Sequence, residues 1–245
     1  MSYSITLRTT ARILHQLTHD HRTVGLLVMV PTVLLTLLYF MYDSSQATFD
    51  RVALIMLGVF PFILMFLVTS IAMLRERTTG TLERLFTTPV AKADLLFGYG
   101  IAFGAAAAVQ AALATLFSVT VLGLDTAGSA WLVLLIAVFN GALGVALGLF
   151  FSAFAQTEFQ AVQFMPIVGI PQLLLCGLFV PREQMAGWLN ALSDVMPLSY
   201  AVEALQEVGR HAEPTSTMWY DLLLVGAVAV CALVLGAATL RRRTQ

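Results

Sequence analysis

Residues 75–92, RERTTGTLERLFTTPVAK, concentrate the side chains of this sequence that could engage another molecule. Thr78 or Thr79 could cap a short helix by accepting hydrogen bonds from its first N–H groups, Gly80 permits a tight entry, and Pro89 would end the helix. An apolar stripe falls on one face of that helix at the spacing i, i+3, i+4: Leu82, Leu85 and Phe86. Such a stripe fits a groove on a partner protein, although an interfacial loop that rests on lipid could carry the same residues.

The sequence lacks the residues that would let the chain hydrolyse ATP itself. A phosphate-binding loop needs glycines followed by a lysine, but Lys92 is the only lysine and follows a proline, a valine and an alanine. Neither HExxH nor GxSxG occurs, and Cys176 and Cys231 stand alone in apolar runs without metal-ligand spacing. We therefore expect no catalytic residue, no metal and no cofactor on this chain, and we place any ATP and Mg on a separate subunit.

The composition predicts an all-α membrane protein. Of the 245 residues, 59% are hydrophobic and 11% are charged, whereas soluble domains carry about 25% charged residues. The net charge of −1 provides no basic field for nucleic acid. A bilayer core takes about 20 helical residues to cross. Six apolar runs qualify as spans: 24–42, 52–74, 95–122, 131–153, 161–180 and 219–240.

The distribution of basic residues predicts the orientation of these spans. Six spans place ten of the thirteen lysines and arginines on one side, which the positive-inside rule makes cytoplasmic. The three basic residues on the other side are Arg51, Arg182 and Arg210. Both termini and the 75–92 loop are then cytoplasmic, and residues 219–245 form the last span with a basic tail.

Two further segments are expected to be helical without crossing the membrane. Residues 1–22 carry Tyr3, Leu7, Ala11 and Leu14 on one face and basic side chains on another, which is typical of an amphipathic helix in the membrane surface; a plain cytoplasmic tail is the alternative. Residues 181–217 read as two short amphipathic helices broken before Pro197, which either dip into the outer leaflet and return or cap the bundle.

Four polar residues within the predicted spans are candidates for a substrate path: Gln110, Asn140, Gln163 and Gln172. Each could equally serve as an interhelical hydrogen-bonding group. Asn140 adjoins Gly141, and with Gly144 and Gly148 it forms a face of small residues suited to close helix packing. No charged side chain lies near the middle of any span, which disfavours an ion-coupled carrier and suits an apolar or amphipathic substrate.

Residues 75–90 resemble the coupling-helix motif of the ABC type-2 permeases, the membrane subunits of daunorubicin-type drug exporters and of polysaccharide and lipid exporters. Residues 177–209 resemble the extracellular re-entrant hairpin of that family, with matches at Pro181, Trp188, Pro197 and Tyr200. The resemblance covers nearly the whole chain. Gln206 departs from it, because many relatives carry an arginine there, and this places only the local contact in doubt.

The resemblance implies a permease subunit of an ATP-driven exporter in the plasma membrane of a prokaryote, moving a drug, lipid or glycolipid outward. Its partners would be two copies of an ABC ATP-binding subunit, a second permease copy or homologue, and membrane lipids, with no nucleic acid. The residues that would couple the chain to the ATPase are Arg75, Glu76, Arg77, Gly80, Thr81, Leu82, Glu83, Arg84, Leu85 and Phe86. An ATP-independent carrier or scaffold is the alternative, and an intramembrane enzyme lacks the cluster of catalytic residues that it would need.

Overall fold

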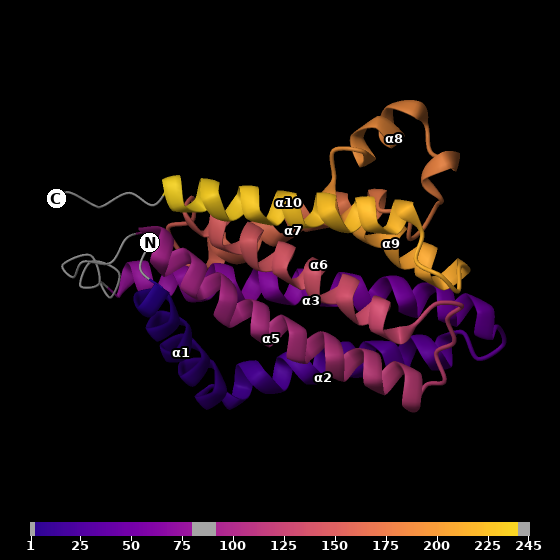
Figure 1. The fold of residues 1–245 in the computed structure, drawn as a ribbon, viewed down its shortest axis with the longest axis horizontal. Helices are drawn as coiled ribbons and strands as arrows, with labels where there is room; N and C mark the ends of the chain where they lie inside the picture. Colours follow the sequence, from indigo (N-terminus) through magenta and orange to yellow (C-terminus); the bar gives the residue numbers. More distant parts are fainter. Residues whose placement is uncertain (1–2, 80–91, 240–245) are drawn as a thin grey trace.

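The computed structural model describes residues 3–79 and 92–239, and in these ranges the chain forms helices and no strand (Figure 1). The α-helices are α1 Tyr3–His19, α2 His21–Met41, α3 Gln46–Thr78, α5 Lys92–Thr120, α6 Ala130–Ser152, α7 Glu158–Leu175, α8 Gly187–Ser193, α9 Pro197–Arg210 and α10 Ser216–Thr239, and η1 Arg182–Gln184 is a 3-10 helix. Five of them are long and apolar enough to cross a membrane: α2, α3, α5, α6 and α10. The expectation of an all-α membrane protein is therefore confirmed.

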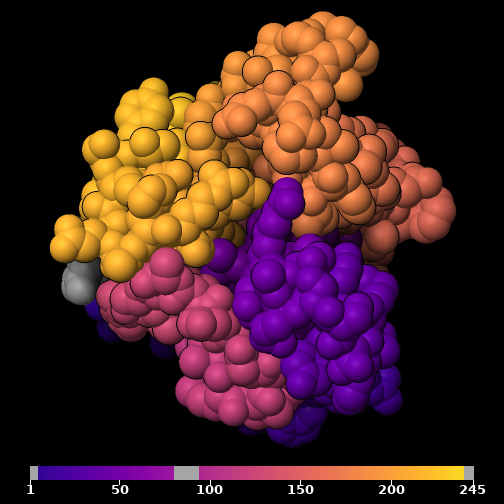
Figure 2. Space-filling view, turned by 90° about the vertical axis from the view of Figure 1, so that its right-hand side faces the viewer, coloured from indigo at the N-terminus to yellow at the C-terminus, as the bar shows by residue number. Residues whose placement is uncertain are grey.

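The long helices run alternately up and down one bundle, so that α1, the end of α3, the start of α5 and the end of α10 share one end (Figure 1). We call this the inner end and the opposite one the outer end. Figure 2 looks onto the outer end, where the α2–α3 turn, the α5–α6 connection and the segment that carries α8 and α9 meet.

Helix α3 forms the centre of the bundle and packs most extensively against α6. Small residues permit this contact: Gly144 and Gly148 of α6 lie against the backbone of Phe62 and Phe66 of α3. Apolar side chains fill the rest of the interface, including the fully buried Leu57. The predicted face of small residues on α6 therefore serves helix packing, as expected where backbones approach closely.

Two predicted spans, the second and the fifth, differ most from the helices in the structure. The second predicted span ends at residue 74, but α3 continues to Thr78, because Arg75, Glu76 and Arg77 are good helix formers. The hydroxyls of Thr78 and Thr79 both donate to the Arg75 carbonyl at this end of the helix. The fifth predicted span, 161–180, corresponds to α7, which begins at Glu158 and ends at Leu175. The chain turns at Gly177, whose φ of +90° ends the helical path.

Helix α9 lies within the bundle and runs antiparallel to α3, toward the outer end (Figure 1). It starts at Pro197, which occupies the first helical turn, where its missing N–H costs nothing. Leu198, Ala201, Val202 and Leu205 are fully buried against neighbours from α3, α6 and α10. The predicted break before Pro197 is present, and the second short helix is built into the protein core.

Candidate coupling site at the inner end

The structure places the first three predicted coupling residues on the last turn of α3, and not in a loop. Seven others lie outside the described residues: Gly80, Thr81, Leu82, Glu83, Arg84, Leu85 and Phe86. Arg75, Glu76 and Arg77 contact residues of different neighbouring helices.

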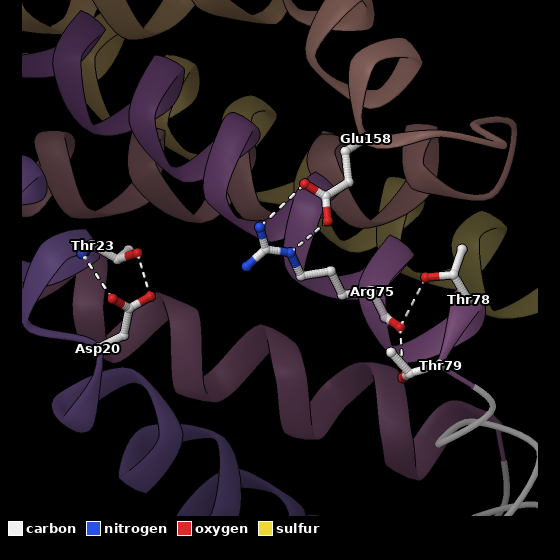
Figure 3. Close-up of polar contacts among 6 residues, drawn as sticks. All are labelled: Asp20, Thr23, Arg75, Thr78, Thr79 and Glu158. Atoms are coloured by element: carbon white, nitrogen blue, oxygen red, sulfur yellow. Dashed lines mark hydrogen bonds and ion pairs between the residues drawn. The ribbon is translucent and has the colours of Figure 1, made fainter.

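Arg75 joins α3 to α7. Its guanidinium donates two hydrogen bonds to Glu158, 2.7 Å from Nε to Oε1 and 3.1 Å from Nη2 to Oε2 (Figure 3). Both side chains are more than half exposed, at 61% and 53%. An exposed ion pair of this kind contributes about 0–1 kcal/mol to the stability of a protein. Its main effect is therefore to fix the position of the end of α3 relative to the start of α7.

Glu76 joins α3 to α1 and α5. Its Oε1 lies 3.4 Å from Nη2 of Arg12, and the same nitrogen donates to the Tyr99 hydroxyl over 3.3 Å. The Glu76 side chain is 12% exposed and Tyr99 is 2% exposed, so this group is far less solvated than the Arg75 pair. Burial makes the loss of one partner costly, because the remaining charge would lack solvent.

Arg77 joins α3 to α6. Its Nη1 donates to the carbonyl of Ser152 over 2.5 Å, at the last residue of α6. The final carbonyls of a helix have no intrahelical partner, and a cation there also opposes the negative end of the helix dipole. The last turn of α3 thus contacts α1, α6 and α7 directly and α5 through Arg12.

The four candidate path residues do not come together within the chain. Asn140 donates to the Gly58 carbonyl over 2.7 Å, which links α6 to α3. Gln172 donates to the Val168 carbonyl and accepts from the Leu198 N–H, which satisfies an otherwise free group at the start of α9. Gln163 is exposed on α7, and Gln110 is buried on α5 with both amide atoms unpaired among the described residues. For Asn140 and Gln172 the contacts seen are those of interhelical hydrogen-bonding groups.

The outer segment is held by a residue that the sequence reasoning did not select, Arg182. Its Nε donates to the Ser193 hydroxyl over 2.6 Å, Nη1 donates to Glu203 over 2.5 Å, and Nη2 pairs with Asp194. The guanidinium also lies over the ring of Tyr200, 5.5 Å from its centre. One cation therefore connects η1, α8 and α9. The excess of acidic over basic residues in 181–217 could have pointed to it.

The predicted hairpin residues have separate roles. Pro181 precedes η1, Pro197 starts α9, and the Tyr200 hydroxyl donates to the Asp194 carbonyl over 2.7 Å. Trp188 is 71% exposed on α8, which suits an aromatic side chain at a membrane–water boundary.

Comparison with known proteins identifies the family of this chain. The family described as ABC-2 type transporter matches residues 6–208, so the chain belongs to that family. It is 26% identical over 156 residues to the probable multidrug ABC transporter permease YbhR of Escherichia coli, covering 64% of this chain and 42% of that protein. It is 25% identical over 178 residues to YbhS, a probable multidrug ABC transporter permease of the same organism, covering 72% and 47%. ABC transporter G family member 20 of Dictyostelium discoideum is 26% identical over 163 residues, covering 64% of this chain and 22% of that protein.

The chain thus spans less than half the length of these relatives. It is a multi-pass membrane protein of the ABC transporter permease class.

Proposed function

We propose that this chain is the six-span permease subunit of an ATP-driven exporter, with α7 as the sixth span beside the five apolar helices. At about 1.5 Å per residue, the 18 residues of α7 extend about 27 Å, close to the thickness of a bilayer core. Six spans bring both termini to the inner end, which carries Arg75 and Arg77 and which we assign to the cytoplasm of a prokaryote.

The observation that carries the proposal is the bonding of the last turn of α3. A separate ATP-binding subunit, holding ATP and Mg, would dock on the segment that follows Thr79. Movement of that segment would pull on α3, and the contacts of Arg75, Glu76 and Arg77 would pass the movement to α7, α1, α5 and α6. Two such ATPase subunits would serve two permease chains, either identical or homologous.

The exposed apolar surfaces of α2 and α7 support pairing and lipid contact. Met29 and Leu37 of α2 and Phe159 and Ile167 of α7 are each more than half exposed. Exposed apolar area on this scale is covered in a membrane protein by lipid or by a second chain. The multidrug permeases among the relatives suggest a hydrophobic or amphipathic cargo, whether drug, lipid or glycolipid.

The test is a pull-down of the tagged chain from gently solubilised native membranes, with mass spectrometry and an ATPase assay on the eluate. We expect a co-purifying protein with a phosphate-binding loop, and its loss when Leu82→Asp and Leu85→Asp are combined. Leu192→Asp, an exposed leucine at the outer end, is the matched control and should retain the partner. Recovery of the chain alone, together with flux in partner-free liposomes, would contradict the proposal and favour an ATP-independent carrier.

A further inference from the structure

A cavity of about 520 Å³ lies at the inner end, between α1, α2, α3 and α5. Its volume falls within the range of roughly 300–1,000 Å³ that small-molecule sites occupy. None of the four candidate path residues lines it. Its apolar wall consists of Ile13, Leu17, Val68, Ile71, Ala72 and Phe103.

Polarity changes along the cavity in the same direction on two helices. On α3 the lining runs from Val68 through Ala72 to Glu76 and Thr79, a rise of about 16 Å for eleven residues. On α5 it runs from Phe103 to Tyr99, and α5 has the opposite direction, so its polar residue also lies toward the inner end. The deeper wall is therefore apolar, and the end nearer the cytoplasmic side is polar.

The polar end carries a net negative charge. The lining residue Arg75 is paired with Glu158 and also attracts Asp20 electrostatically, and the lining residue Glu76 is paired with Arg12. These three carboxylates and two guanidinium groups together carry one net negative charge. Asp20 is exposed at the edge of the cavity, and no basic side chain hydrogen-bonds to it among the described residues.

Local hydrogen bonds keep Asp20 ionised. Its carboxylate accepts from the Thr23 hydroxyl over 2.6 Å and from the Thr23 N–H over 3.2 Å, in the N-cap position of α2 (Figure 3). These bonds favour the charged form and lower the pKa of Asp20 below its ordinary value. The Thr23 contacts also hold the carboxylate in place at the edge of the cavity.

We propose that this cavity is a binding site for a lipophilic organic cation, whose apolar groups pack on α3 and α5 and whose charge lies near Asp20. Within the proposed export function, this assigns a substrate class and a loading site at the inner leaflet. The transport role rests on the proposed function, whereas binding to the isolated chain does not.

The test is binding of radiolabelled tetraphenylphosphonium to the chain in nanodiscs of zwitterionic lipid, with empty nanodiscs as background. Tetraphenylborate has the same shape and the opposite charge, so it separates charge recognition from apolar partition. We expect saturable binding of tetraphenylphosphonium and no saturable binding of labelled tetraphenylborate, each measured in a separate sample because the two ions precipitate together. Because no ATPase is present, failure here and failure of the pull-down are independent results.

Two variants locate the site. Asp20→Asn keeps an N-cap acceptor while removing the charge, and we expect roughly tenfold weaker binding, as for loss of one nearby charge in a partly solvated site. Ala72→Phe fills the apolar wall and should weaken binding by a similar factor or more. Asp43→Asn in the α2–α3 turn and Ala47→Phe in a separate cavity at the outer end are the matched controls and should bind as the wild type does.

Thermal melting of each variant establishes that it is folded before binding is compared. No saturable binding above empty nanodiscs, or equal binding of the anion, would overturn the proposal. The proposal would also be overturned if the folded variants Asp20→Asn and Ala72→Phe both bound tetraphenylphosphonium with wild-type affinity.

Discussion

Replacing Gly144 by alanine tests whether the contact of α3 with α6 depends on the missing side chain. A Cβ at this position would lie 2.3 Å from the carbonyl oxygen of Phe62, and ordinary contacts begin at 3.4 Å. The two backbones would therefore have to separate locally by 3.4 − 2.3 = 1.1 Å. The obstructing atom belongs to the backbone of a buried helix, so no side-chain rotation can relieve the overlap.

The expected loss follows from two opposing effects. Overpacking of a buried contact lowers the free energy of unfolding by about 1–3 kcal/mol. The higher helix propensity of alanine raises it by up to about 1 kcal/mol. We expect a net decrease of about 1–2 kcal/mol in the free energy of unfolding. The measurement is an SDS titration in mixed micelles, followed by circular dichroism.

Gly104→Ala on α5 is the matched control, because a Cβ there would meet nothing within 4 Å. This control should leave the free energy of unfolding unchanged or raise it by up to about 1 kcal/mol. If Gly144→Ala proved as stable as Gly104→Ala, the close approach of the two helices would not depend on that glycine.

Three further outcomes follow from the ion pairs and the helix cap. Arg182→Ala should lower the free energy of unfolding by about 1–2 kcal/mol, because the carboxylates that it pairs with are partly solvated. It should also increase hydrogen exchange in α8. The control Arg210→Ala removes an exposed arginine and should change neither quantity. Arg12→Ala should lower the free energy of unfolding by about 1–3 kcal/mol, because its partner Glu76 is buried. Arg75→Ala breaks an exposed pair and should lower it by at most about 1 kcal/mol. Equal losses of the two variants in chemical unfolding would contradict the argument from burial. The Asp20 carboxylate should stabilise the start of α2 fully above its ordinary pKa of 3.8 and lose this effect as the pH falls through its lower folded value. The melting temperature of the wild type should thus exceed that of Asp20→Ala at pH 6, and the difference should shrink in acid below the ordinary value.

Much of the fold follows from the sequence by itself. The apolar runs predict helices because a bilayer leaves no other partner for backbone N–H and C=O groups. Each predicted run matches a helix in the structure to within six residues at either end. The break before Pro197 was also predictable, since proline disfavours helix at the residue that precedes it. The residues of the 75–90 motif indicated the family, which the match over residues 6–208 confirms, and the separate ATPase stays a prediction.

The tertiary structure alone decided which residues meet. Arg75 and Glu158 are 83 positions apart, and Arg77 reaches the carbonyl of Ser152 across 75 positions. Nothing in the types of these residues selects such partners, because an arginine can pair with many carboxylates and any helix end offers free carbonyls. The pairing depends on the axial register and rotation of each helix. These are set by the packing of many side chains together, such as the contact of Gly144 with the backbone of Phe62. The same register places Asp20 beside an apolar cavity, which the sequence could not indicate.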